Sequence, residues 1–87
     1  MSIVRDWFTV GQSATARCFS DIPATRMEWL TNGVVVESTA STQHLNLVFS
    51  LVNDSVHHQV YICRVTREVD GMTATHNFTV NVNGRTT

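Results

Sequence analysis

The sequence predicts an all-β fold, an antiparallel sandwich of two sheets, and three observations lead to it. Thirteen Val and twelve Thr stand among the 87 residues, and β-branched side chains favour a pleated strand over a helix. Apolar and polar residues alternate with a period of two in almost every segment, whereas no long stretch carries a helical stripe. Turn residues separate seven or eight short runs of this kind, which is typical of a sandwich.

Length and charge limit the classes of protein further. A chain of 87 residues has room for one domain, and we expect its core to span about residues 3–83. The net charge of -1 argues against nucleic acid or an anionic membrane as a partner. No apolar run approaches the roughly 20 residues of a membrane span, and residues 1–5 lack the apolar stretch of a signal peptide.

The first half of the chain predicts two strands and a hairpin. Residues 13–20 place three small side chains on one face: Ala14, Ala16 and Cys18. Residues 25–31 place Met27 and Trp29 on one face and three residues on the other: Arg26, Glu28 and Leu30. The dipeptide Asn32-Gly33 then suits a type I′ turn, whose two central residues need positive φ. Such a turn pairs Trp29 with Val36 and Leu30 with Val35, so residues 34–37 form the returning strand.

The second half predicts a loop and three more strands. We expect a polar loop at residues 38–42, and after it four apolar residues alternate: Leu45, Leu47, Phe49 and Leu51. Residues 60–67 and 73–82 are the last two runs, joined through Asp70-Gly71. A two-residue turn there predicts three cross-strand pairs that bring the large apolar residues to one face: Cys63 with Phe78, Tyr61 with Val80, and Val65 with His76.

The two cysteines, Cys18 and Cys63, have three readings: a disulfide, a reactive pair, or two unrelated buried thiols. A zinc pair is disfavoured because structural zinc needs four ligands and the chain has no close Cys-x-x-Cys or His-x3-His spacing. A bridge closing a loop of 45 residues would add about 4 kcal/mol to the stability of a small domain. A disulfide, and with it an oxidising compartment, is therefore favoured.

Cys18, Trp29 and Cys63 resemble, in order and spacing, the cysteine, tryptophan and cysteine of an immunoglobulin-like domain. Gly11 before the first cysteine and Tyr61 two residues before the second extend the resemblance over essentially the whole chain. The resemblance implies a two-sheet sandwich with one inter-sheet disulfide. It also implies that Trp29 packs on this bridge and that the Tyr61 hydroxyl bonds upstream backbone. The register predicted above adds Phe78 to the core beside Trp29 and Tyr61.

The chain departs from the family pattern just before Tyr61. Members commonly carry Asp-x-Gly there, whereas this chain has His57-His58-Gln59-Val60. The bend into the strand expected at residues 60–67 must therefore be stabilised differently. The interval of 45 residues between the cysteines is too short for a variable-type domain. It is similar to the I-set or C2-type modules of adhesion molecules and receptors, including receptor tyrosine kinases.

Two glycosylation sequons favour an extracellular location. Asn53-Asp54-Ser55 lies between two expected strands, and Asn77-Phe78-Thr79 lies on the last one, where Asn77 should face outward beside Arg64. The alternative is a cytoplasmic muscle-type immunoglobulin domain with reduced cysteines.

Catalysis and metal binding are not expected. The four histidines, His44, His57, His58 and His76, fall in loops and strand edges, and in an extended chain His57 and His58 would point to opposite sides. No nucleophile motif is present, and the resemblance assigns both cysteines a structural role. We expect a domain that is not an enzyme and needs no cofactor or metal.

The outward face of the expected C, C-prime and F strands is the candidate interface. It should show four clustered apolar residues beside one basic residue, Arg64. The apolar residues are Leu30, Val35, Val60 and Ile62. A protein partner or a second copy would bind there, although scattered aliphatic residues are also ordinary on sheets. Trp7 and Phe8 should pack against the domain as part of an edge strand, and the alternative is that they contact a preceding module. These features predict a recognition or spacer module of a cell-surface or secreted protein. The module itself would not bind a membrane, and only the parent chain would attach it to one.

Overall fold

The computed structural model describes residues 2–83, except for the side chain of Ser41, and these residues are all-β, as predicted. The elements follow in the order β1 (Ser2–Arg5), β2 (Phe8–Thr9), β3 (Ala14–Thr31), β4 (Val34–Phe49), the 3-10 turn η1 (Asp54–Val56), β5 (Val60–Arg67), β6 (Thr73–Thr79) and β7 (Val82–Asn83). Met1 and residues 84–87 lie outside the described part. Within it, no helix is long and apolar enough to cross a membrane.

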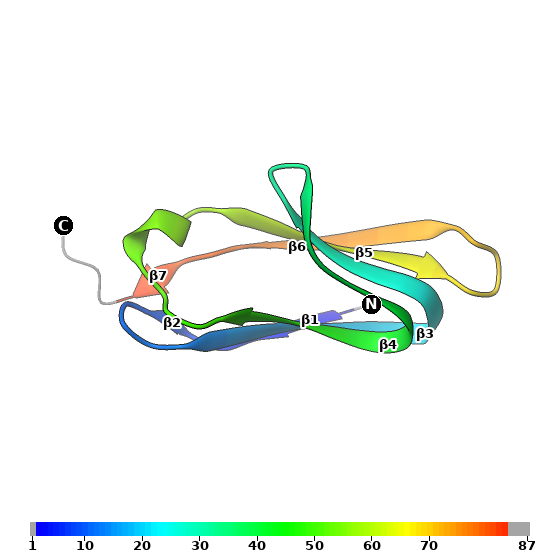
Figure 1. The fold of residues 1–87 in the computed structure, drawn as a ribbon, viewed down its shortest axis with the longest axis horizontal. Helices are drawn as coiled ribbons and strands as arrows, with labels where there is room; N and C mark the ends of the chain where they lie inside the picture. Colours follow the sequence, from blue (N-terminus) through cyan, green and yellow to red (C-terminus); the bar gives the residue numbers. More distant parts are fainter. Residues whose placement is uncertain (1, 84–87) are drawn as a thin grey trace.

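The strands form two antiparallel layers that share β3 and β4 (Figure 1). The first layer contains β1, residues 14–19 of β3 and residues 44–49 of β4. In the second layer, residues 24–31 of β3 lie between residues 34–42 of β4 and β5, and β6 forms the far edge. The buried side chains lie between the layers, an arrangement consistent with a β-sandwich.

Strands β3 and β4 are longer than predicted, because the chain stays extended where we expected breaks. Residues 21–24 and the expected loop at residues 38–42 are both strand. The pairing shifts between Phe19 and Ala24, where β3 has four residues opposite one residue of β4. The extra length lets β3 follow the outside of the bend, so both strands pass from one layer to the other without leaving their ladder.

The beginning of the chain divides between two partners. β1 runs antiparallel to β3, whereas β2 runs parallel to β7. Asp6 holds the step between them, since its backbone N–H donates to the Thr15 carbonyl and its carboxylate accepts the Thr15 N–H. Phe8 is buried, as expected, but Trp7 is 84% exposed, so the prediction that both pack on the domain is wrong for Trp7. Trp7 lies between β1 and β2, so neither strand pairing holds its ring against the core, whereas Phe8 begins the ladder with β7.

The hairpin at Asn32-Gly33 forms as predicted, with positive φ at both residues, 51° and 75°. Leu30 pairs with Val35, as expected, but Trp29 pairs with Glu37 rather than with Val36. A bulge at this point inserts one extra residue into β4. Bulges depend on tertiary packing and leave little trace in the alternation of apolar residues.

The loop between β5 and β6 is longer than the predicted two-residue turn. Tyr61 pairs with Phe78, Cys63 with His76 and Val65 with Ala74, so all three predicted pairs are wrong by two residues. The reason is that Asp70 caps a wider loop by accepting the Met72 N–H, while the Gly71 N–H donates to the Arg67 carbonyl. A shift of two preserves the face of every side chain, so Phe78 remains in the core.

The strand that begins the alternation at Leu45 ends at Phe49, two residues earlier than expected. Leu45 and Leu47 are buried, but β4 stops at Phe49, and Leu51 is 65% exposed. Val52 is buried in its place, and its N–H and C=O bond with the turn at Gly11 and Gln12. Leu51 therefore does not continue the strand, because the chain leaves β4 before reaching it.

The disulfide between Cys18 and Cys63 joins the two layers, and both residues are fully buried. Trp29 is the cross-strand neighbour of Cys63, and its indole N–H donates to the Leu45 carbonyl at 3.0 Å. That bond also runs from the second layer to the first. The Phe78 ring meets the Trp29 ring edge-on, with centroids 5.7 Å apart. The predicted core residues Trp29, Tyr61 and Phe78 are all buried.

Replacing Trp29→Phe should therefore lower the free energy of unfolding by about 2–3 kcal/mol, because the Leu45 carbonyl loses its donor and a cavity remains. Urea unfolding followed by circular dichroism measures the loss. The matched control is Trp7→Phe, the same change at an exposed ring, which should alter stability by no more than about 0.5 kcal/mol. Equal losses in the two variants would contradict the role given to Trp29.

Candidate functional site

The candidate interface is a continuous patch on the outward side of the second layer. Leu30 is the cross-strand neighbour of both Val35 and Ile62. Val60 follows on the same side of β5, two residues before Ile62. Leu30 and Ile62 are half-buried, whereas Val35 and Val60 are exposed. The structure thus brings the four predicted apolar residues together, with Leu30 in the middle.

An ion pair borders the patch. Glu28 and Arg64 are cross-strand neighbours, and the Arg64 Nε and Nη2 atoms donate to Glu28 Oε1 at 3.0 Å and 2.9 Å. Glu28 is only 9% exposed, because the arginine side chain covers it. Two donors on one carboxylate oxygen fix the position of both side chains. The pair is neutral overall, so the border of the patch favours neither an acidic nor a basic partner.

The pairing of Arg64 with Glu28 was not predicted from the sequence, although a signal existed. Glu28 and Arg64 belong to the same register as Trp29 and Cys63. The family resemblance placed Trp29 and Cys63 on neighbouring strands, and extending that register by one residue gives the Glu28–Arg64 pair.

Both sequon asparagines are exposed, but their surroundings differ from expectation. Asn77 pairs with Ile62, not with Arg64, because of the shifted register between β5 and β6. A glycan on Asn77 would therefore lie beside the apolar patch itself. Asn53 caps η1, since its side-chain oxygen accepts the Ser55 N–H at 2.9 Å.

Histidines support the bend into β5, where the family's Asp-x-Gly is missing. His57 Nδ1 accepts the Val82 backbone N–H at 2.9 Å, and the His58 N–H donates to the Val80 carbonyl. The rings of His57 and His58 lie together, with centroids 3.8 Å apart. The expectation that they point to opposite sides is wrong, because His58 has a φ of 66° rather than an extended backbone. No sequence signal identified this use of an imidazole.

The Tyr61 hydroxyl does not make the backbone bond that the resemblance implied. It lies 3.4 Å from Gln59 Oε1, a side-chain acceptor two residues upstream. Its ring packs edge-on against Phe49 and stacks on Phe78. The 3-10 turn and the His57 bond occupy the corner instead.

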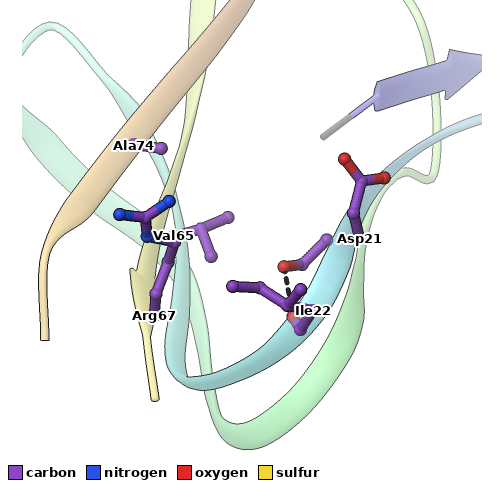
Figure 2. Close-up of a pocket in the computed structure, with 6 residues that line it drawn as sticks. Asp21, Ile22, Val65, Arg67 and Ala74 are labelled. Atoms are coloured by element: carbon purple, nitrogen blue, oxygen red, sulfur yellow. Dashed lines mark hydrogen bonds between the residues drawn. The ribbon is translucent and has the colours of Figure 1, made fainter. Parts of the chain in front are cut away.

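A hollow in the described residues lies at the bend of β3. This pocket has a volume of about 210 Å³ and lies between the bend of β3 and the ends of β5 and β6 (Figure 2). Val65 and Ala74 line it together with Ile22, and the Ser20 hydroxyl donates to the Ile22 carbonyl. Arg67 at its rim is paired with Asp70. Across residues 2–83, no three His, Cys, Asp or Glu side chains gather where they could hold a metal ion.

Comparison with known proteins adds no relative: no family model, no curated protein and no solved structure matches this chain.

Tyr61 makes the alkaline stability of the domain a measurable test of the site's packing. Burial raises the pKa of its phenol above the ordinary value of 10.0. The contribution of the protonated phenol to the free energy of unfolding is then complete below pH 10.0 and is lost as the pH rises through the folded-state pKa. The chain has one Tyr and no Lys, and its cysteines are bonded, so Tyr61 dominates titration between about pH 9 and pH 11.

The free energy of unfolding should therefore fall with pH over this range in the native protein and stay nearly flat in Tyr61→Phe. Urea unfolding at a series of pH values measures both slopes, and tyrosinate absorbance follows the titration directly. Identical slopes in the two proteins would show that the phenol is not desolvated.

Proposed function

We propose that this chain is an immunoglobulin-like domain of the I-set or C2 type, an extracellular module of a cell-surface receptor or adhesion protein that acts by protein–protein contact. The apolar, charge-balanced patch around Leu30 is the observation that carries the proposal. The fold, the compartment and the patch each supply a separate argument.

The arrangement of the strands supports the family assignment. In immunoglobulin domains, strands A, B and E share one sheet and strands C, F and G share the other, with a B–F disulfide beneath a strand C tryptophan. Here β1, residues 14–19 of β3 and residues 44–49 of β4 lie in the first layer, and Cys18 and Cys63 join the layers beside Trp29. One departure is the continuous β4, which takes the place of separate C-prime, D and E strands.

The cysteines and sequons support an extracellular location. Disulfides persist in oxidising compartments, and the Cys18–Cys63 bridge is weakly consistent with such a compartment. Asn53 and Asn77 are both exposed, as acceptors of a glycan must be. A cytoplasmic muscle-type domain would need neither feature.

The patch around Leu30 supports recognition of a protein. Clustered aliphatic side chains on a sheet, beside an ion pair whose charges cancel, suit an interface with an apolar centre. Leu30 and Ile62 are half-buried, which limits the apolar surface that a partner could contact. A structural spacer without a partner of its own is therefore the second candidate, and an ectodomain module of a receptor tyrosine kinase is a variant of the first.

Binding of a multimerised form of the domain to a panel of intact cells distinguishes these functions. Leu30→Glu places a charge in the middle of the patch and should lower binding at least about tenfold, since a buried unpaired charge costs several kcal/mol. Val69→Glu, the same charge on the exposed loop between β5 and β6, is the control and should leave binding unchanged.

Binding that survives Leu30→Glu would refute the interface. Failure of the native domain to bind any cell would favour the spacer.

A further inference from the structure

β4 is an edge strand along its whole length, and one of its backbone carbonyls, that of Leu45, already accepts the Trp29 indole N–H. In the described part of the chain, its residues pair with β3 and with no other strand. Residues 45–49 of β4 therefore form the outer edge of the first layer. The N–H and C=O groups on the outer side of such an edge form a template for another strand.

This edge lacks the features by which proteins usually prevent strand addition. Residues 38–53 contain no Asp, Glu, Lys or Arg, and also no Pro or Gly. Charges, prolines and glycine bulges are the common protections of an exposed edge. The edges at β1 and β6 differ, since β1 carries Arg5 and β6 carries the sequon asparagine Asn77. Residues 45–49, which read Leu-Asn-Leu-Val-Phe, instead combine high strand propensity with zero charge.

A groove lined mainly by apolar side chains, with Glu37 and Asn46 among them, runs beside the same edge. A hollow of 450 Å³ separates the two halves of β4, and its lining is Val36, Glu37, Asn46, Leu47, Val48, Phe49 and Tyr61. The Phe49 and Tyr61 rings meet edge-on at 5.3 Å and close its inner side. Val48 points outward and is 65% exposed. A strand added to the edge would cover these side chains as well as the backbone groups.

We propose that this edge pairs with the same edge of a second copy of the chain, antiparallel, so that the first layers of two molecules form one continuous sheet. The absence of charge carries the choice of occupant. In an antiparallel pair of identical short strands, each side chain lies opposite or diagonal to a side chain of the same segment, so a Lys or Glu in residues 45–49 would lie near its own copy across the axis and repel it. Residues 45–49 have no such residue.

The alternation of side chains supports a definite register. With Leu47 on the two-fold axis, Leu45 of one copy lies opposite Phe49 of the other, and Asn46 lies opposite Val48. Every inward residue then meets an inward residue, and every outward residue meets an outward one. Because each copy uses its own edge for the contact, the pairing closes on itself and gives a dimer rather than a filament.

This contact differs from the proposed interface around Leu30, which lies on the outward face of the second layer. The two proposals can therefore succeed or fail separately.

Sedimentation of the oxidised, unglycosylated chain over a concentration series tests the proposal, together with amide hydrogen exchange at the lowest and highest concentrations. We expect a monomer–dimer equilibrium, with exchange slowed at high concentration in residues 44–50 and unchanged in β6. Val48→Lys places two lysines near the axis and should raise the dimer dissociation constant at least about tenfold. Val69→Lys is the matched control on an exposed loop and should change it less than about twofold.

Leu30→Glu should leave the dimer intact, which separates this contact from the one around Leu30. A chain that stays monomeric at every concentration would overturn the proposal, as would higher oligomers without a dimer. A dimer that resists Val48→Lys, or that protects residues other than 44–50, would also overturn it.

Discussion

The bond between Cys18 and Cys63 is the constraint on which the rest of the structure depends, because it fixes the separation of the two layers at their most buried point. Trp29 lies beside Cys63 and adds a second tie through its hydrogen bond to Leu45. With these ties in place, β3 and β4 can pass from one layer to the other while keeping their pairing. A domain of this length has a small core, so a covalent tie supplies a large part of its stability.

The sequence predicted the faces of the strands better than it predicted their ends. Alternation placed Met27 and Trp29 on one face of their strand and Phe78 on the apolar face of the last strand, and all three are buried. Period-two reasoning tolerates a shift of two residues, which is why the core was right although the β5–β6 register was wrong. The continuity of β4 through residues 38–42 was not predictable in this way, since polar residues become strand there only because β3 lies beside them.

The candidate patch followed from the same alternation, so Leu30, Val35, Val60 and Ile62 lie together as expected. What sequence reasoning could not supply was chemistry between side chains distant in the chain. The bond from Val82 to His57 Nδ1 is one case, because it depends on the direction of a single ring at the corner. The free edge of β4 is another. Its lack of charge is visible in the sequence, but its position at the rim of a layer is visible only in the fold (Figure 1).

The oxidation state of Cys18 and Cys63 tests the account most directly. Intact mass spectrometry of the purified chain, with a parallel titration of free thiols, measures it. The account predicts a mass lower by two hydrogens than that of the reduced sequence, and no free thiol. A free-thiol titre of two in protein isolated without reductant would contradict it, since neither the tie between the layers nor the argument for an extracellular location would then remain.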